Sequence, residues 1–315
     1  MTKPLISIPI VTYNSSEYII ETLESVKAQT YPRIELIISD DCSKDDTVTL
    51  CREWLAKNSA RFERIELIEA KKNTGVSGNL NRAEAACTGE WVKLLDGDDL
   101  LLPSCLEDYV TYVTEHPEIV YLFSRGEAFG STEERNKYFT EEVFDYTIYA
   151  LDVKQQYERL LSKNCVLSST CMYNRKKNAE LGLKNDERIP LLEDWPRWVN
   201  VTKKGVKLSF LDKVEVKYRL RDDSLSTSNR LKANYYHSVR LFCFLYQYPE
   251  WSKDNLGKAA TRVVNDEIEI YNFLMESEKQ LNQIRQSTAY RLGKLLLHPN
   301  KLNFCNLFHI KMKSK

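Results

Sequence analysis

Leu94-Leu95-Asp96-Gly97-Asp98-Asp99-Leu100-Leu101-Leu102-Pro103 places three carboxylates in one turn, between an apolar run and a leucine-rich segment. The pattern at 91–95 predicts a buried strand that ends at the acids, and Pro103 suits the first turn of a following helix. Like charges this close repel each other unless a cation neutralises them, and oxygen ligands suit Mg²⁺ or Mn²⁺. A metal site for substrate phosphates therefore competes with a solvated turn in which Asp99 caps the helix.

Composition indicates a folded, globular protein. The chain has 315 residues, of which 43% are hydrophobic, enough for one large domain with an appendage or for two ordinary domains. Its 45 basic and 45 acidic side chains cancel, so nucleic-acid binding has no electrostatic support. Eight cysteines without a C-x-x-C pair favour buried free thiols over zinc or disulfides. Neither an export leader nor a bilayer-spanning segment is evident, so we expect a cytoplasmic protein.

Strand, polar loop and helix alternate along the first hundred residues. This alternation indicates a mostly parallel sheet flanked by helices, and ligands of such sheets bind at the carboxyl ends of the strands. Taken alone, Asp40 and Asp41 are equally explained as turn residues, and Tyr13 as packing. The predicted strands are 6–11, 34–38, 65–68 and 91–95, and the predicted helices are 18–29, 48–57 and 78–87. The candidates at the strand ends are Tyr13, Asp40, Asp41, Asn73 and Asp98.

The pattern is less regular after Pro103. Asp194 precedes Trp195-Pro196, where a helix begins, so it suits either an N-cap or a partly desolvated general base. Arg219 and Arg221 alternate along an extended segment and face one side, which suits phosphate binding or pairing with acids. The predicted elements are strands at 119–123, 168–173, 206–210 and 214–218, a helix at 153–161, and an irregular insertion at 126–149.

The carboxyl-terminal part has helical periodicity at 229–248 and 256–286, followed by a basic end. After Glu278 the chain carries eight Lys and Arg residues and no Asp or Glu. An amphipathic basic tail such as 289–315 suits an anionic membrane surface, where each basic residue adds about 1 kcal/mol. A frayed tail or a helix that docks on a partner is the alternative. We favour the membrane, and expect a peripheral protein at the inner face of the plasma membrane.

Five motifs in sequence resemble the inverting family 2 glycosyltransferases. The motifs are Ser7–Asn14 (SIPIVTYN), Ser39–Ser43 (SDDCS), Asn73–Ser77 (NTGVS), Leu95–Asp99 (LDGDD) and Glu193-Asp194. The resemblance implies an α/β, GT-A-like fold, Mn²⁺ or Mg²⁺ as cofactor, and a nucleoside-diphosphate sugar as donor, with a lean to UDP or dTDP. The implied acceptor is a glycan or a lipid-linked glycan. The implied division is a catalytic domain at 1–225 (nucleotide-sugar half about 1–103, acceptor half about 104–225), a helical extension at 226–288 and the basic tail at 289–315.

The resemblance also implies a role for each matching residue. Asp194 would be the catalytic base, and Asp98 would ligate the metal on the donor diphosphate. Asp96 would support that metal site and contact the sugar or ribose. Tyr13 would stack on the nucleobase, and Asp41, with Asp40 beside it, would bond the base or ribose. The implied nucleotide-sugar residues are Pro9, Val11, Tyr13, Asp40, Asp41, Asn73, Ser77, Asp96, Gly97, Arg219 and Arg221.

The chain departs from the family pattern at three positions, and two other functions compete. Cys42 stands where the D-D-G-S loop has Gly, Arg221 where many members have His, and Leu80 at a place that is often basic. Phosphate neutralisation would then fall on the metal and the arginines. A non-catalytic nucleotide-sugar-binding subunit would not need Asp194. An enzyme that makes nucleotide sugars would need a glycine-rich phosphate cradle, which the first loop lacks.

Overall fold

The computed structural model describes residues 3–221, 238–239 and 241–251. The predicted tail and most of the predicted helical extension lie outside these residues. The chain divides into two compact units, Met1–Pro249 and Glu250–Lys315, and the fold reported below is that of the first unit.

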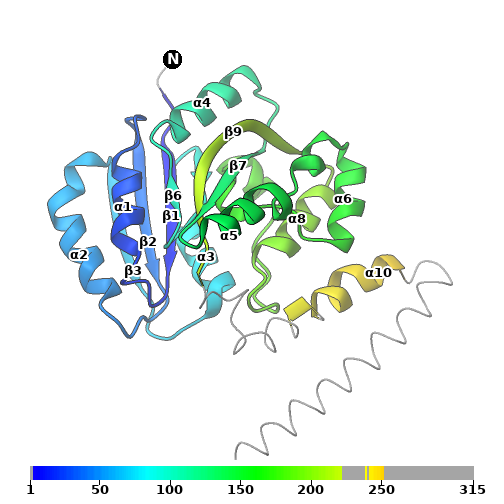
Figure 1. Cartoon of the computed structure of the whole chain (residues 1–315). Coiled ribbons are helices and arrows are strands. Elements are labelled where there is room, and N and C mark those ends of the chain that lie inside the picture. Colours follow the sequence, from blue (N-terminus) through cyan, green and yellow to red (C-terminus); the bar gives the residue numbers. More distant parts are fainter. Residues whose placement is uncertain (1–2, 222–237, 240, 252–315) are drawn as a thin grey trace, which may run out of the picture. The chain divides into compact units, whose positions relative to one another are not determined.

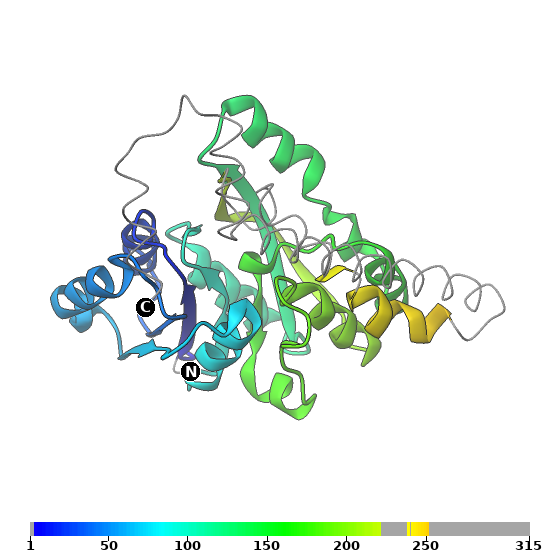
Figure 2. The ribbon, with the colours of Figure 1, turned by 90° about the horizontal axis from the view of Figure 1, so that it is seen from below.

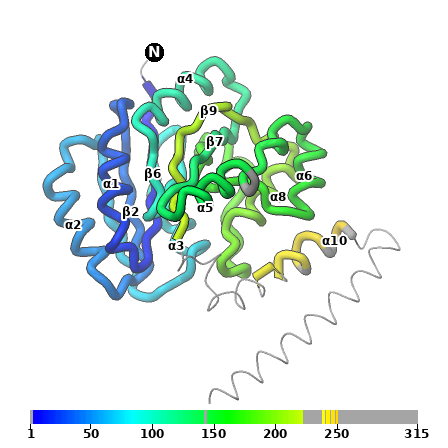
Figure 3. The backbone as a smooth tube through the Cα atoms, in the orientation of Figure 1, coloured from blue at the N-terminus to red at the C-terminus, as the bar shows by residue number. Residues whose placement is uncertain are grey.

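The first half alternates strands and helices, as the hydrophobic periodicity predicts. The helix predicted to begin at Gly78 begins three residues earlier, at Gly75. Pro103 was predicted in the first turn of the following helix, but it lies two residues before that helix, which begins at Cys105. The elements are β1 (Ile6–Thr12), α1 (Ile19–Lys27), β2 (Ile34–Asp40), α2 (Thr47–Asn58), η1 (Ser59–Arg61), β3 (Arg64–Glu69), α3 (Gly75–Ala85), β4 (Trp91–Lys93), β5 (Leu95–Asp96), β6 (Leu100–Leu101) and α4 (Cys105–Glu115). The tube in Figure 3 runs from β6 through α4 into the second half.

The second half contains more helix than the sequence predicts. The irregular insertion at 126–149 continues the preceding strand and then forms short helices, and the strands predicted at 206–210 and 214–218 are one strand with a bulged register. The elements are β7 (Tyr121–Phe129), α5 (Glu133–Tyr138), the π-helix η2 (Phe139–Val143), η3 (Tyr146–Ala150), α6 (Val153–Ser162), η4 (Ser168–Thr170), β8 (Met172–Asn174), α7 (Arg175–Glu180), α8 (Asp194–Lys203), β9 (Leu208–Arg219), the π-helix η5 (Cys243–Gln247) and α10 (Tyr248–Trp251).

One mixed sheet of nine strands runs through the first unit (Figure 1). Its strand order is β3-β2-β1-β4-β8-β7-β9-β6, and β5 pairs with β1. Strands β1 to β5 pair with one another in parallel, as do β7 and β9, which agrees with the predicted mostly parallel sheet. The antiparallel pairs are β4 with β8, β7 with β8, and β6 with β9. The carboxyl ends of β1, β2 and β5 therefore meet at one edge.

Apolar side chains alternate between the two faces of the sheet, and helices cover both. In β2, Leu36 and Ile38 join the core beneath α1, α2 and α4, whereas Ile37 joins the core beneath α3, α6 and α8. In the view from below, α1 and α2 lie on one side of the blue strands and α3 on the other (Figure 2). Because helices cover both faces of the sheet, polar side chains gather at the ends of the strands.

The seven cysteines of the described residues are free, and four of them are buried. This finding confirms the predicted free thiols for those positions, while Cys305 lies outside the described residues. Burial raises the pKa of the Cys51 and Cys171 thiols to about 12, which keeps them protonated and unreactive. Within the same part of the chain, no helix has both the length and the apolar character needed to cross a membrane.

Gly97 brings β5 against β1, and this contact leaves no room for a side chain. A Cβ atom at this position would lie 2.9 Å from the Val11 carbonyl oxygen and 3.0 Å from Thr12 Cγ2. We predict that Gly97→Ala lowers the free energy of unfolding by about 1–3 kcal/mol, the usual range for overpacking. Chemical denaturation measures this change, and an unaltered midpoint would show that the strands relax without cost.

Glu215 on β9 is a buried acid that makes stability depend on pH. Its side chain is fully buried, neither carboxylate oxygen has a hydrogen-bond partner among the described residues, and Lys213 Nζ lies 3.3 Å away but closer to Asp108. Burial, and secondly the charge of Asp108, raise the pKa of Glu215 to about 7. The folded state therefore favours the protonated form, and the stability gained from it is lost as pH rises through that value.

From this shift we predict that Glu215→Gln stabilises the protein more at pH 8 than at pH 5, by about 2 kcal/mol, since each pKa unit is worth about 1.4 kcal/mol. Unfolding curves of both proteins at the two pH values provide the measurement. An equal effect of the substitution at both pH values would disprove the assignment.

Candidate active site

Four carboxylates from two distant motifs share one site at the end of β5. Asp96 ends β5 and Asp98 follows it, while Glu193 and Asp194 stand at the start of α8. Burial, followed by the charges of Asp98 and Asp194, raises the pKa of Asp96 to about 7. Burial likewise raises the pKa of Glu193 to about 8, with contributions from Asp194 and Asp96. The structure thus brings together two acidic motifs almost a hundred residues apart.

Asp194 is oriented by hydrogen bonds on both of its oxygens. It is the first residue of α8, with Glu193 at the N-cap position, so the predicted N-cap is displaced by one residue. Its Oδ1 still accepts from the Trp195 backbone N–H (2.6 Å), and its Oδ2 accepts from Asn164 Nδ2 (3.1 Å). Burial raises the pKa of Asp194, while these donors act in the opposite direction. A half-buried carboxylate held in this way can accept a proton from a nearby hydroxyl.

The two predicted arginines pair with acids of the site. Arg221 Nη1 donates to Asp98 Oδ2 at 3.0 Å, and Arg219 Nε donates to the Asp98 carbonyl oxygen at 2.8 Å. Both guanidinium groups lie over the ring of Tyr18, at 4.8 Å for Arg219 and 4.7 Å for Arg221. Arg219 also pairs with Glu21. The alternation of these arginines therefore places them on one side, as predicted, where they fix the acidic turn.

Asp99 does not cap α4, contrary to our expectation. Its Oδ1 accepts from the Arg219 backbone N–H at 2.9 Å, so it joins the acidic turn to the end of β9. Burial, followed by the charges of Asp98 and Asp96, raises the pKa of Asp99 well above its usual range. The contact is with a residue 120 positions away, and no local pattern could have indicated it.

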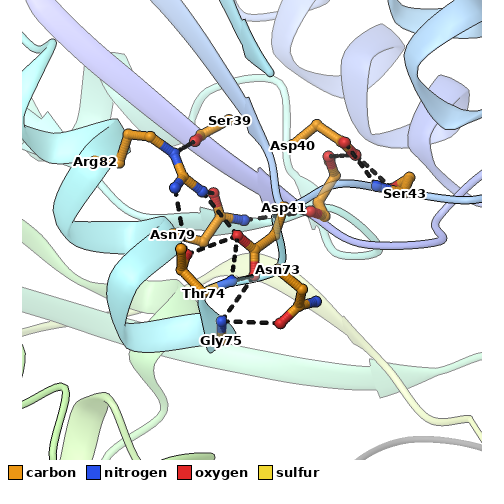
Figure 4. A network of polar contacts seen from close by, with 10 residues as sticks. Ser39, Asp40, Asp41, Ser43, Asn73, Thr74, Gly75, Asn79 and Arg82 are labelled. Atoms are coloured by element: carbon orange, nitrogen blue, oxygen red, sulfur yellow. Dashed lines mark hydrogen bonds and ion pairs between the residues drawn. The ribbon is translucent and has the colours of Figure 1, made fainter. Parts of the chain in front are cut away.

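Asp41 is the centre of a hydrogen-bond network at the carboxyl end of β2 (Figure 4). Its two oxygens accept from the backbone N–H groups of Thr74 (2.9 Å) and Gly75 (2.8 Å), from Thr74 Oγ1 (2.7 Å) and from Arg82 Nη2 (2.9 Å). The carboxylate therefore satisfies the amino end of α3, which explains the earlier start of that helix. Any contact with a base or ribose would share oxygens that already have protein partners.

The loops after β1 and β2 are tied to each other. Asp40 accepts from Thr12 Oγ1 at 3.0 Å and from the Ser43 backbone N–H at 2.9 Å. Cys42 has φ 68°, which is the left-handed region that favours glycine and accounts for Gly at this place in the D-D-G-S pattern. Tyr13 lies at the end of β1 with half of its surface exposed (50%), so it offers a ring to a ligand.

The remaining candidates differ in exposure. Pro9 is buried in the middle of β1, opposite Ile37 of β2, whereas Val11 lies half-buried near the end of the strand. Asn73 is exposed, and its Oδ1 accepts from Gly75. Ser77 is buried in α3, and its Oγ has no hydrogen-bond partner among the described residues. The structure thus places Val11 closer to the strand end than Pro9.

The acidic cluster fits a divalent cation that is completed by a substrate. Among the described residues, no group of three or more His, Cys, Asp or Glu side chains is close enough to form a full protein cage. Mg²⁺ and similar ions commonly take one or two carboxylates together with substrate phosphates. Asp98 has a partly exposed carboxylate (25%), and Asp96 supplies further negative charge beside it. A cation here would relieve the repulsion that raises the pKa of Asp96.

Sequence reasoning missed two polar residues of the site. Asn164 orients the Asp194 carboxylate, and Arg82 pairs with Asp41 and donates to Ser39 Oγ at 3.1 Å. Arg82 is on α3, two residues after Leu80, so a cation is present near the place that is often basic in the family. The i, i+3 spacing of Asn79 and Arg82 on one helix face was a weak signal that the two side chains interact. Nothing in the sequence pattern pointed to Asn164.

The profile described as Glycosyl transferase family 2 matches residues 7–182, more than half of the chain. The chain belongs to glycosyl transferase family 2. Relatives agree with this membership. TuaG of Bacillus subtilis (strain 168), a glycosyltransferase assigned to teichuronic acid biosynthesis, is 29% identical over 231 residues, which cover 73% of this chain and 84% of TuaG. The Escherichia coli protein WfaP, named as a UDP-Glc:alpha-D-GlcNAc-diphosphoundecaprenol beta-1,3-glucosyltransferase, is 29% identical over 231 residues, covering 72% and 82% of the two chains.

Two solved structures share the fold. The S. aureus protein TarS, residues 1–349 in complex with UDP-GlcNAc, gives a TM-score of 0.61 at 20% identity over 85% of this chain and 72% of TarS. The mannosyltransferase PcManGT from Pyrobaculum calidifontis, in complex with GDP-Man and Mn²⁺, gives a TM-score of 0.58 at 16% identity over 93% of this chain and 83% of PcManGT. The predicted GT-A fold and the predicted glycosyltransferase class are therefore confirmed.

Proposed function

We propose that this family 2 glycosyltransferase transfers a sugar from a nucleoside-diphosphate sugar to a hydroxyl of a glycan or lipid-linked glycan, with inversion of configuration. The observation that carries the proposal is the shared acidic site, in which the charges of Asp98 and Asp194 act together on Asp96. A diphosphate site and a base within one electrostatic cluster are what a single displacement requires.

We assign the metal to Asp98, with Asp96 in support. The donor diphosphate is an anion, and the acidic cluster would repel it unless its charge were neutralised. A bound Mn²⁺ or Mg²⁺ would supply this neutralisation and would stabilise negative charge on the diphosphate. Arg221 and Arg219 contact the Asp98 side chain and backbone, respectively, and hold the acidic turn in place.

The remaining roles concern the donor and the acceptor. Tyr13 offers its exposed ring for stacking on the base, and the Asp41 network fixes the adjoining loops. Asp194, oriented by Asn164 and the Trp195 N–H, takes the acceptor proton as the oxygen attacks the anomeric carbon. The names of WfaP and of the TarS complex favour a uridine donor, while the PcManGT complex contains GDP-Man.

A thermal-shift screen tests the donor class with the full-length protein. UDP-, dTDP- and GDP-sugars are compared, each with Mn²⁺, Mg²⁺ or EDTA, because a bound ligand raises apparent stability in proportion to its affinity. We expect the largest shift from a UDP- or dTDP-sugar with a divalent cation. Equal shifts with and without the cation would contradict the metal assignment, and no shift from any nucleotide sugar would contradict the proposed donor.

We also propose that the basic tail attaches the enzyme to the inner face of the plasma membrane. The tail lies outside the described residues, and its charge supports the proposal.

We predict that the triple substitution Arg291→Gln, Lys294→Gln, Lys301→Gln reduces flotation with phosphatidylglycerol vesicles, since each charge adds about 1 kcal/mol near an anionic surface. The control carries Lys137→Gln, Lys154→Gln and Lys176→Gln on exposed positions of the first unit. Equal flotation of both variants would rule out the tail as the segment that attaches the enzyme to the membrane.

A further inference from the structure

A hollow of about 1210 Å³ lies away from the acidic cluster, and we call it the distal hollow. It is lined by residues from α4, η3 and the beginning of β9, together with Arg125 of β7. Its volume exceeds the roughly 300–1,000 Å³ of most small-molecule pockets, so it can hold an oligomeric ligand. Glycosyl transfer as proposed above does not use this surface.

The strands β7 and β9 connect the distal hollow with the candidate active site. They run in parallel, pairing Tyr121 with Leu208 at the hollow and Phe129 with Arg219 at the acidic turn. Phe123 and Phe129, which pair with Phe210 and Arg219, are six residues apart on β7, which corresponds to roughly 20 Å along a strand. A ligand in the hollow is thus far from the reacting atoms but on the same two strands.

A row of aromatic rings follows the same direction. Ring centroids are separated by 5.5 Å between Phe210 and Tyr146, 6.4 Å between Tyr146 and Phe144, and 5.8 Å between Phe144 and Tyr218. Burial, followed by the charge of Asp99 and the other site acids, raises the pKa of Tyr218, so this ring adjoins the acidic cluster. The hollow and the active site therefore share one continuous packed wall.

Arg125 presents preorganised hydrogen-bond donors in the hollow. Its guanidinium lies over the rings of Tyr146 (4.7 Å) and Phe210 (5.8 Å), and its Nε pairs with Asp212. Both partners of this pair are exposed, at 40% and 69% of their side chains. Among the described residues, the two Nη groups have no hydrogen-bond partner. A flat guanidinium held on aromatic rings loses little freedom when it binds hydroxyl oxygens.

The charges of the hollow favour a neutral ligand. Its lining contains three cations, Arg125, Lys163 and Lys207, against four carboxylates. Two of these carboxylates already have partners within the hollow, since Asp212 pairs with Arg125 and Asp145 lies 3.8 Å from Lys163. A surface on which carboxylates slightly outnumber cations does not attract an anionic chain, whereas adjacent donors and acceptors beside aromatic edges suit the hydroxyl groups and C–H face of a sugar.

We infer that the distal hollow binds a neutral oligosaccharide segment of the acceptor, remote from the hydroxyl that reacts. Arg125 and Asp212 hydrogen-bond its hydroxyl groups, and the aromatic wall contacts its C–H faces. This inference rests on the proposed function, because it assigns to the hollow a part of the same glycan acceptor whose hydroxyl reacts at the acidic cluster.

Isothermal titration calorimetry tests the inference with the full chain and the hexamers of β-1,4-glucose, β-1,3-glucose and β-1,4-N-acetylglucosamine. We expect at least one hexamer to bind, and Arg125→Ala to weaken that binding at least tenfold. The matched control is Arg52→Ala, which breaks the exposed Arg52–Glu69 ion pair outside the hollow. Binding by no hexamer, equal weakening in both variants, or binding only of an anionic chain such as polyglutamate would overturn the inference.

Slow hydrolysis of the nucleotide sugar without acceptor separates this inference from the proposed function. Arg125→Ala should hydrolyse the donor at the wild-type rate, since the residue does not contact the acidic cluster, and a reduced rate would overturn the assignment to the acceptor. Absence of hydrolysis and of donor binding in the wild-type protein would count against the proposed function, whereas the calorimetry of the hexamers would still decide the inference.

Discussion

Replacing Asp194 by Asn should lower turnover by about 10²- to 10⁴-fold, the usual contribution of a general base, while donor affinity stays unchanged. Asn has nearly the same shape and can still accept from Asn164 Nδ2, but it cannot take the acceptor proton. The measurement combines steady-state release of nucleoside diphosphate with calorimetry of the donor. Near-normal turnover would remove Asp194 as the base.

Glu193→Gln is the matched control for this prediction. Glu193 is adjacent, its pKa is also raised by burial, and it belongs to the same acidic cluster. The substitution removes a neighbouring titratable acid without removing the proposed base, so we expect less than about a tenfold change in turnover. An equal loss in both variants would mean that either acid of the cluster is needed for the rate, and would remove the specific assignment of a base at position 194.

Replacing Asp98 by Ala should abolish the dependence of donor binding on the metal. In the wild-type protein, calorimetry with Mn²⁺ should give at least about tenfold higher donor affinity than calorimetry with EDTA, which is about 1.4 kcal/mol. In Asp98→Ala the two values should coincide, because the carboxylate that holds the ion is absent. The substitution also releases Arg221 from its ion pair, so the informative quantity is the difference between the two conditions.

Asp46→Ala is the control for Asp98→Ala. Asp46 is an exposed acid at the start of α2, and its side chain makes no capping hydrogen bond. Its loss should leave the effect of Mn²⁺ intact. A variant Asp98→Ala that still responds to Mn²⁺ as the wild type does would show that the ion binds elsewhere.

The sequence predicted the first half of the fold well because its signals are local. Strands β1 to β4 lie where hydrophobic runs end in polar loops, and the two faces of the sheet follow from alternation along β2. Errors arose where a distant residue decided the local structure. Helix α3 begins earlier than predicted because Asp41 binds its amino end. Strand β6 was not predicted, because it has only two residues and forms by pairing with Lys217 and Val216 of the distant β9.

The candidate site was partly predictable for the same reason. Acids that follow strands must gather at one edge of a parallel sheet, so Asp96 and Asp98 could be found from the alternation alone. That Asp194 joins them depends on the packing of α8, and the motif resemblance indicated it where periodicity could not. The partners Asn164 and Arg82 had no clear signal, because a hydrogen bond between distant residues has no pattern in the sequence.

The most direct test of the account follows donor cleavage by nuclear magnetic resonance, using an α-linked UDP-sugar, Mg²⁺ and no added acceptor. Phosphorus spectra identify the released nucleotide, and early proton spectra identify the anomer of the released sugar. We predict nucleoside diphosphate together with the β-anomer, because a single displacement on the side opposite the diphosphate inverts the anomeric carbon. Release of pyrophosphate, or of the α-anomer, would contradict the account.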